Sequence, residues 1–272
     1  MVNSFGSLLD KVRACKPLVH HITNYVTVND CANITLAIGA SPVMADSILE
    51  VSDISSISSA LVLNIGTLNE RTIPSMVAAG KAANERGIPV ILDPVGVGAS
   101  KFRNDTALDL IANVRLNVLR GNISEIRFIA GLSSETRGVD ASESDLSDLD
   151  SAGKIAKTLA QKLGCVVVIS GATDVVSDGV RTFYIENGHY LLSKLTGSGC
   201  MCSSLIGSFC GASGDDYLLA AAAAMLCMGV VGELAYEQAG LRGNGSFHAA
   251  LHDAVSLLDA KTLERLGRYN EA

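Results

Sequence analysis

Residues 151–169, SAGKIAKTLAQKLGCVVVI, join a helix directly to a strand. Apolar residues recur at helical spacing between Ser151, which can cap the first turn, and Gly164, which ends the helix. The run Cys165–Ile169 follows at once and is continuously apolar, which is typical of a strand buried on both faces. This stretch therefore predicts one helix–strand unit of an α/β sheet.

The same alternation of strand and helix extends toward the N-terminus. Apolar runs of about five residues predict buried strands, and amphipathic helices separate them. Such strands are typical of a mostly parallel sheet that lies between two layers of helices, an α/β/α sandwich. The predicted strands are Ala60–Asn64, Pro89–Asp93 and Asn117–Arg120, and the predicted helices run from Ile73 to a stop at Gly87 and over Asp105–Val114.

The rest of the chain completes this plan without a second domain. Asp174–Ser177 and Arg181–Ile185 flank Asp178-Gly179 and predict a hairpin at an edge of the sheet. The acidic, serine-rich stretch Ser133–Ser151 is predicted to be a solvated loop, and the last third of the chain is predicted to be helical. We find no internal repeat and no linker, so residues 1–272 are predicted to form a single domain.

The bulk composition excludes several classes of protein. The chain has 272 residues, of which 48% are hydrophobic and 18% charged, and its net charge is −7. Because nucleic acid binding needs a concentrated positive surface, we expect no nucleic acid partner. Tyr217–Ala235 is apolar enough to resemble a membrane span, but acidic residues precede and end it, so we expect a buried helix and no membrane partner.

The cysteines and histidines indicate neither a disulfide framework nor a metal site. The seven cysteines are odd in number and include no C-x-x-C pair, which favours reduced thiols in a cytoplasmic protein. The N-terminus lacks the charged and apolar regions of a signal peptide. His20-His21 is typical of a strand end or a capped turn. His248 and His252 have i, i+4 spacing but no third ligand beside them in the sequence, which favours a surface or interface helix.

Polar residues follow the predicted strands at the point where each strand ends. Asn64 ends one strand, Asp93 the next, Arg120 the third and Ser170 the fourth. In an open α/β sheet, ligands bind outside the carboxyl ends of the parallel strands. The sequence therefore predicts that these four side chains meet at one binding site.

A glycine turn, Thr196-Gly197-Ser198-Gly199-Cys200, precedes a run of small and apolar residues. If a helix begins at about Cys200, the exposed amides of Gly197, Ser198 and Gly199 form an anion site at its N-terminus. Cys200 would then stand beside that site, which suggests transfer of a phosphoryl group to an acceptor next to the thiol. The alternative is a tight turn before a core helix. Neither a P-loop nor a G-x-G-x-x-G motif occurs in the chain.

Arg120-Gly121-Asn122-Ile123-Ser124-Glu125 resembles the N-x-x-E motif of ribokinase-superfamily kinases, and 196–199 resembles the anion-hole turn of the same superfamily. That superfamily usually places Asp where Cys200 stands. Cys200 in place of that Asp, together with the segments around Asn24, 40–44 and 63–68, makes the chain similar to the hydroxyethylthiazole kinase family. The resemblance extends from about residue 17 to residue 258.

The resemblance implies a ribokinase-like fold and ATP-dependent phosphorylation of the hydroxyl of 4-methyl-5-(2-hydroxyethyl)thiazole in thiamine salvage. It also implies a Mg²⁺ requirement and a homotrimer with active sites between subunits. By matching position, Cys200 would be the catalytic residue, as a base or as a group that only orients the substrate hydroxyl. The other implied roles are thiazole binding by Met44, Gly197, Asn24 and Gly66, ATP binding by Arg120 and Ser170, and organisation of Mg²⁺ by Asp93 and Glu125 with support from Asn122.

Two departures from the family pattern affect no chemistry. Ser170 stands where the family more often has Thr, which keeps the hydroxyl, and Asn244 replaces the usual Pro in Gly243–Phe247. Three alternatives compete with this interpretation: another kinase of the same fold, acting on hydroxymethylpyrimidine or a sugar; a catalytically silent nucleotide-binding regulator; and a Rossmann-type oxidoreductase. Cys200 and residues 41–44 argue against the first, the intact Asp93, Asn122 and Glu125 against the second, and the missing fingerprint against the third.

Overall fold

One sheet runs through the whole molecule. The structure is a computed structural model, and it describes residues 4–132 and 145–272. Within these residues the strand order is β2-β1-β3-β4-β5-β6-β7-β8-β9. Strands β1 to β6 pair in parallel and β7 to β9 are antiparallel. The strands are β1 Leu18–Ile22, β2 Ser41–Met44, β3 Ala60–Asn64, β4 Val90–Asp93, β5 Val118–Asn122, β6 Val166–Ser170, β7 Asp174–Ser177, β8 Thr182–Ile185 and β9 Tyr269–Glu271.

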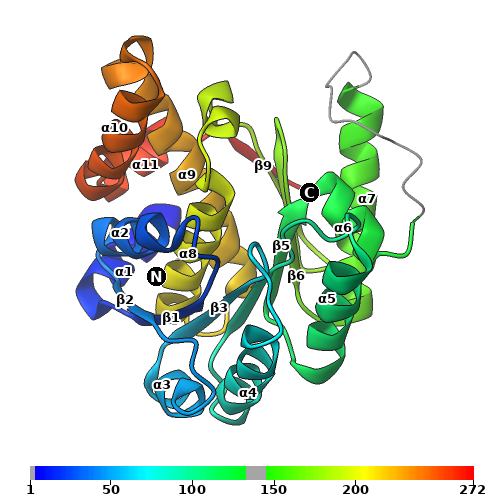
Figure 1. Cartoon of the computed structure of the whole chain (residues 1–272). Helices are drawn as coiled ribbons and strands as arrows, with labels where there is room; N and C mark the ends of the chain where they lie inside the picture. The colour runs from blue at the N-terminus through cyan, green and yellow to red at the C-terminus, as the bar shows by residue number, and fades with distance from the viewer. Residues whose placement is uncertain (1–3, 133–144) are drawn as a thin grey trace.

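Helices cover both faces of the sheet, as Figure 1 shows. Two separate apolar cores result, one on each face. The first face carries α1 Phe5–Cys15, α2 Val28–Ile38, α8 Ser198–Ser213, α9 Tyr217–Ala239, α10 Asn244–Leu257 and α11 Ala260–Leu266. The second face carries α3 Val51–Ile57, α4 Thr72–Glu85, α5 Lys101–Asn113, α6 Ile123–Ile129 and α7 Asp145–Leu163. The predicted three-layer α/β/α sandwich with a mostly parallel sheet is confirmed.

The alternation of side chains along each central strand separates the two cores. In β3, Val62 packs into the first core, while Leu61 and Leu63 pack into the second. All three side chains are buried. Because neighbouring residues of a strand point to opposite faces, a strand between two helical layers must be apolar at every position. This requirement explains the continuous apolar runs in the sequence.

Helix α9 is the apolar segment that resembles a membrane span. Its most apolar stretch has a mean hydropathy of 2.0, and 83% of that stretch is buried inside the molecule. It packs against α8 and α10 in the first core. The segment is therefore a core helix, as predicted.

Three local predictions were wrong. Helix α5 begins at Lys101, four residues before the predicted Asp105, and Ser100 caps it. Helix α7 begins at Asp145, so Ser151 lies inside it and does not cap it, and residues 145–151 are not loop. Leu149 continues the apolar face of α7 onto the second core. The remainder of the predicted loop, 133–144, lies outside the described residues. The hairpin β7–β8 is not at the edge of the sheet, because β9 pairs with β8. Strand β9 is a short exposed segment whose sequence has no strand pattern.

The parallel strands bring their carboxyl ends to one edge of the sheet, and the N-terminus of α8 lies at the same edge. Helix α8 crosses β1, β3 and β4 on the first face. Its close approach is possible because Gly207 has no side chain: a Cβ there would lie 2.6 Å from Val62. The chain therefore places the glycine turn beside the strand ends.

Candidate active site

The glycine turn forms the N-terminus of α8. The helix begins at Ser198, two residues before the predicted start, and Gly197 is its N-cap with φ of 89°. Residues other than glycine rarely adopt this backbone conformation, and a Cβ at Gly197 would also lie 2.7 Å from Thr27. In the described part of the chain, the amides of Gly199 and Cys200 have no acceptor. The first turn of α8 thus offers two free N–H groups.

Two asparagine side chains hold the sulfur of Cys200. Nδ2 of Asn24, in the loop after β1, and Nδ2 of Asn64, at the end of β3, each donate to Sγ at 3.3 Å. The remaining N–H groups of these amides go to Asn64 Oδ1 at 3.0 Å and to Asp93 Oδ2 at 2.9 Å. All four amide hydrogens are therefore used. The sulfur accepts two of them, and its partly exposed side is free to face an acceptor molecule.

Backbone donors fix the orientation of both asparagine side chains. Asn64 Oδ1 accepts from the amide of Gly66 at 2.9 Å. Asn24 Oδ1 accepts from the amide and the hydroxyl of Thr27, both at 3.1 Å. A flipped amide would place N–H against N–H at each of these contacts. Each amide therefore presents its nitrogen to Cys200.

Asp93 is the buried carboxylate at the centre of the site. Its Oδ2 accepts from Ser203 at 2.7 Å and lies 3.7 Å from Arg120, while Oδ1 is buried with no hydrogen-bond partner among the described residues. Burial raises the pKa of Asp93 to about 6, although the positive charge of Arg120 opposes this rise. An unsatisfied buried carboxylate oxygen is a ligand that a hard cation would complete.

Arg120 connects Asp93 to the next strand and to α8. Its Nη2 donates to the hydroxyl of Ser170 at 3.0 Å. Burial lowers the pKa of Arg120. The negative charges of neighbouring carboxylates, above all that of Asp93, have a larger opposite effect and hold this pKa above its ordinary value. The guanidinium also packs on Gly199, where a Cβ would lie 2.8 Å from Nη1. A positive charge is thus held beside the free amides of α8.

Asn122 and Glu125 form the capping box of α6. Asn122 Oδ1 accepts from the amide of Glu125 at 2.9 Å, and Glu125 Oε2 accepts from the amide of Asn122 at 2.8 Å. Glu125 Oε1 accepts from Gly96 at 2.8 Å, which anchors the loop after β4. The carboxylate also lies close enough to Asp93 to contribute to the rise of its pKa. Asp93 and Glu125 are therefore two carboxylates at the strand ends that could together hold a divalent cation.

The structure separates one predicted residue from this cluster. Met44 lies at the carboxyl end of β2, the edge strand, and is 36% exposed. Within the described residues, a pocket of about 180 Å³ opens between the strand ends and this edge, and Asn64, Thr23 and Tyr25 contribute to its lining. In a single chain the pocket is small and bordered by Tyr25, which is 77% exposed.

Sequence reasoning missed three residues that shape the site. Ser203 bonds to Asp93, Thr27 orients Asn24, and the carboxylate of Asp174 accepts from Gly171 at 2.9 Å near Arg120. Burial raises the pKa of Asp174 to about 7. Helical spacing could have identified Ser203, which follows Gly199 by one turn. Thr27 and Asp174 offer no comparable signal, because their roles depend on loop geometry.

Comparisons with known proteins agree on one family. The model of the hydroxyethylthiazole kinase family matches residues 9–261. The hydroxyethylthiazole kinase of Clostridium beijerinckii is 59% identical over 98% of this chain and 96% of its own. A solved hydroxyethylthiazole kinase structure from Pyrococcus horikoshii has a TM-score of 0.89 and 38% identity over 98% of both chains.

A more distant likeness concerns the fold alone. The pyridoxal kinase of Staphylococcus aureus, solved with AMP-PCP and pyridoxal, has a TM-score of 0.59 at 14% identity, over 80% of this chain and 88% of its own. Together with the closer solved structure, this likeness confirms the ribokinase-like form of the α/β/α sandwich.

Proposed function

The chain belongs to the hydroxyethylthiazole kinase family, and from this premise we propose how its side chains transfer a phosphoryl group from ATP to the hydroxyl of 4-methyl-5-(2-hydroxyethyl)thiazole. The observation that carries the proposal is the position of Cys200. Its sulfur stands at the N-terminus of α8, held by two amides, next to the buried pair Asp93–Arg120.

The acceptor hydroxyl lies against Cys200 in this proposal. Because Asn24 and Asn64 donate to the sulfur, the thiol can accept a further hydrogen bond only from its partly exposed side. The substrate hydroxyl donates there, and its oxygen is directed toward the glycine turn. The thiazole ring lies beside the thiol with Asn24, Gly66, Met44 and Gly197, as the family resemblance implies.

The transferred phosphoryl group lies at the first turn of α8. The free amides of Gly199 and Cys200 and the positive helix end stabilise negative charge there. Arg120, supported by Ser170, supplies a full positive charge beside them. Phosphoryl transfer passes through a loose transition state, so positioning and charge neutralisation account for most of the catalysis. We therefore assign Cys200 chiefly an orienting role, with proton acceptance as its second task.

Asp93 and Glu125 would hold Mg²⁺, with Asn122 in support. The fit rests on Oδ1 of Asp93, a hard oxygen donor that has no hydrogen-bond partner among the described residues, and on the nearby carboxylate of Glu125. When bound, the ion neutralises charge on the phosphates. The residues of the chain orient these carboxylates: Ser203 and Asn64 bind Oδ2 of Asp93, so that only Oδ1 remains for a ligand.

We extend the proposal to a homotrimer whose sites lie between subunits. Met44 lies on the edge strand, and apolar side chains on the loops at the same edge are exposed. Leu49 is 89% exposed and Tyr25 is 77% exposed, with Ile48 and Val26 beside them in the sequence. Exposed apolar side chains gathered beside a small, open pocket favour a neighbouring subunit as the missing wall. We also propose a cytoplasmic location, which suits the free thiols.

Alkylation of the thiols tests the proposed acceptor position. Cys200 and Cys15 are the accessible thiols, whereas the other five are buried. Saturating thiazole alcohol should slow the alkylation of Cys200, measured by mass spectrometry, and leave the alkylation of Cys15 unchanged. Equal rates at Cys200 with and without the thiazole alcohol would refute its placement in the acceptor pocket.

A further inference from the structure

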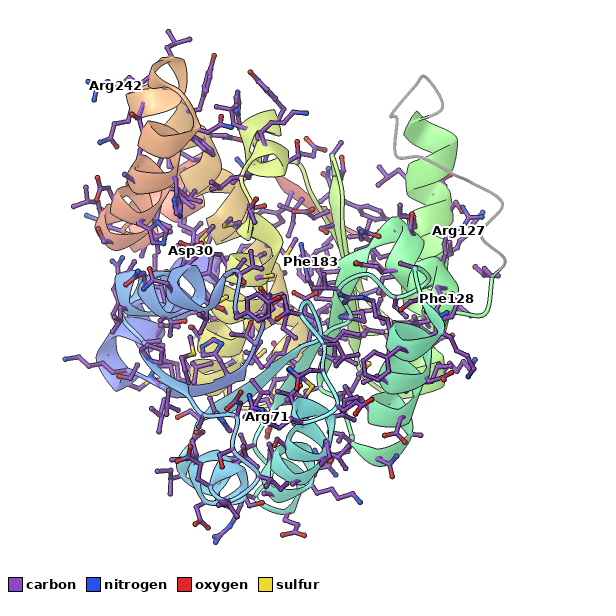
Figure 2. The ribbon with its side chains drawn as sticks, in the orientation of Figure 1. Asp30, Arg71, Arg127, Phe128, Phe183 and Arg242 are labelled. Atoms are coloured by element: carbon purple, nitrogen blue, oxygen red, sulfur yellow. The ribbon has the colours of Figure 1, made fainter. Side chains whose placement is uncertain are left out.

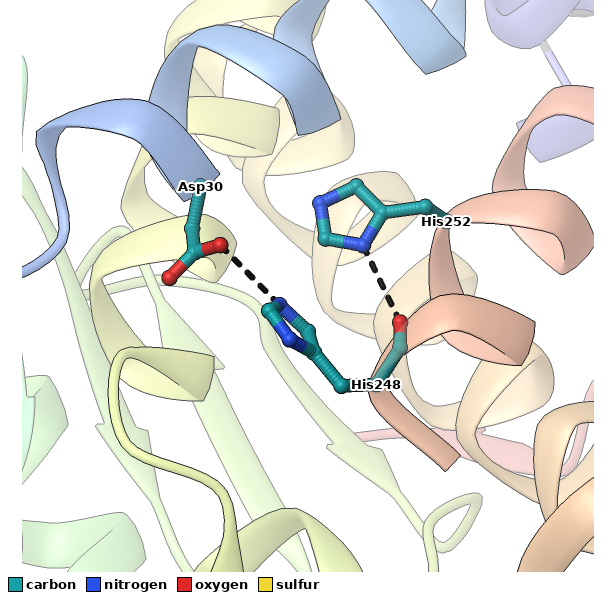
Figure 3. A group of neighbouring side chains, drawn as sticks. All are labelled: Asp30, His248 and His252. Atoms are coloured by element: carbon teal, nitrogen blue, oxygen red, sulfur yellow. Dashed lines mark hydrogen bonds and ion pairs between the residues drawn. The ribbon is translucent and has the colours of Figure 1, made fainter. Parts of the chain in front are cut away.

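Outside the candidate active site, an aspartate of α2 and two histidines of α10 come together. Asp30, His248 and His252 each offer one ligand atom, and these atoms lie within 4.8 Å of one another (Figure 3). The i, i+4 pair of histidines was expected to lack a third ligand. Helix α2 supplies it from a residue more than two hundred positions away in the chain. In Figure 2, Asp30 lies where α2 meets α10.

The ring of His252 is prepared to act as a ligand. Its Nδ1 lies 3.1 Å from the carbonyl oxygen of His248. Because a carbonyl only accepts, Nδ1 carries the proton, and Nε2 of the neutral ring therefore has a free lone pair. This Nε2 is buried and has no hydrogen-bond partner among the described residues. A backbone carbonyl that orients the second ring nitrogen is the usual support of a metal-binding histidine.

The distance between His248 and Asp30 is that of a strong hydrogen bond, but the angles at the two atoms are not. Nε2 of His248 lies 3.0 Å from Oδ1 of Asp30, yet it forms no directed hydrogen bond within the part of the chain that the structure describes. Two ligands of one tetrahedral Zn²⁺ ion are about 3.4 Å apart. The distance between His248 and Asp30 is close to this value, and the ligand atom of His252 lies within 4.8 Å of both groups.

We propose that Asp30, His248 and His252 bind a divalent transition metal, and specifically Zn²⁺. Two imidazole nitrogens and one carboxylate oxygen match zinc and do not suit Mg²⁺, which prefers oxygen ligands. All three residues are partly buried, which leaves the fourth position for water. The site is separate from the carboxylates assigned to Mg²⁺, so the proposal stands whether or not those assignments hold.

The position of the site defines what the metal would do. Asp30 lies in the first turn of α2, and its Oδ2 is 3.6 Å from the place of a Cβ on Gly197. Bound zinc would connect α2 to α10 directly behind the glycine turn and would neutralise the carboxylate there. An ion pair between Asp30 and protonated His248, without any metal, is the alternative.

Zinc binding to the full chain tests the proposal. Protein that has been treated with a chelator and kept reduced is titrated with Zn²⁺ in the presence of Mg²⁺, and bound zinc is counted per chain. We expect one equivalent for the unaltered protein. His252→Ala and Asp30→Asn should weaken binding at least tenfold, since even outer-sphere changes cost about 10- to 100-fold. His189→Ala removes a histidine outside the cluster and should leave binding unchanged.

Cobalt distinguishes this cluster from the thiols. Co²⁺ bound by nitrogen and oxygen ligands should show visible d–d bands without a thiolate charge-transfer band, and these bands should vanish in His252→Ala. Circular dichroism verifies that each variant is folded. The proposal is overturned if the folded protein takes up no zinc, if uptake is the same in His252→Ala, or if the cobalt spectrum shows thiolate ligation.

Discussion

The side chain of Cys200 illustrates how neighbouring residues determine what one group can do. Its sulfur accepts from Asn24 and Asn64, and Asn64 in turn donates to Asp93. The amides therefore link the acceptor position to the buried carboxylate in a network with no unused amide hydrogen. The sequence marked Asn64, Asp93 and Cys200 through strand ends and a glycine turn. It could not show these bonds, which depend on how loops place side chains.

Substitutions at Cys200 separate orientation from covalent catalysis. Cys200→Ala should lower turnover by roughly one to three orders of magnitude, within the range of acid–base groups. Cys200→Asp should remain active, because a carboxylate can accept from both asparagine amides and from the substrate hydroxyl. Steady-state rates of both variants provide the check. An inactive Asp variant that still binds thiazole alcohol would contradict the proposed role.

The raised pKa of Asp93 predicts an acid limit for metal binding. Its pKa of about 6 lies above the ordinary 3.8 because of burial. The native state therefore holds this proton more tightly, and the associated stability, present below about pH 4, is lost as the pH rises to about 6. Protons should compete with the metal below about pH 6, and the dissociation constant should rise up to about tenfold per unit.

The binding of Mn²⁺, a stand-in for Mg²⁺, tests this acid limit at Asp93. It is measured by electron paramagnetic resonance at about pH 5 and about pH 7.5. The His252→Ala background removes the histidine cluster from the titration. Equal affinities at the two pH values would show that Asp93 is not a metal ligand.

At the scale of elements, the buried helices and strands were predictable and their ends were not. β3 has its predicted bounds, and β4, β5 and β6 differ by one or two residues at their ends. The predicted starts of α5 and α7 were wrong, and α8 begins two residues before the predicted position, because a helix start depends on its cap or on a continued apolar face. β9 was not predicted, since its three exposed residues follow no pattern and it is a strand only because β8 offers a free edge.

Two glycines of α8 allow a matched test of this helix. Gly199→Ala should displace the guanidinium of Arg120, which a Cβ would approach to 2.8 Å, and should lower turnover and ATP affinity with little change in melting temperature. Gly207→Ala should instead press on Val62 and lower the melting temperature, at a cost of about 1–3 kcal/mol. If Gly199→Ala destabilised the fold as much as Gly207→Ala while its activity was retained, the functional role of the turn would be refuted.

At the scale of the whole molecule, a parallel sheet brings distant segments of the chain to one edge. Residues from the loop after β1, from the ends of β3, β4, β5 and β6 and from α8 meet there, although they span most of the chain. The sequence predicted this convergence because the carboxyl ends of parallel strands share one edge. It could not predict that Asp30 would meet His248, since that contact follows from helix packing rather than from strand order.

The exposed apolar loops predict assembly. Light scattering should give about three times 28.3 kDa. Leu49→Asp should shift the protein toward monomer and lower its activity, because a charge would be buried at the interface. Val180→Asp is the matched control: Val180 is 76% exposed in the β7–β8 turn, far along the sheet, and its change should leave the assembly intact. A fully active monomer would contradict the shared site.

Turnover of ATP with and without 4-methyl-5-(2-hydroxyethyl)thiazole tests the central claim most directly. The account predicts that ADP forms at a substantial rate only when Mg²⁺ and the thiazole alcohol are both present, with one thiazole phosphate made for each ADP. The pyrimidine alcohol and pyridoxal should give little ADP under the same conditions. ADP formation that does not depend on the thiazole alcohol, or that is equally fast with pyridoxal, would contradict the account.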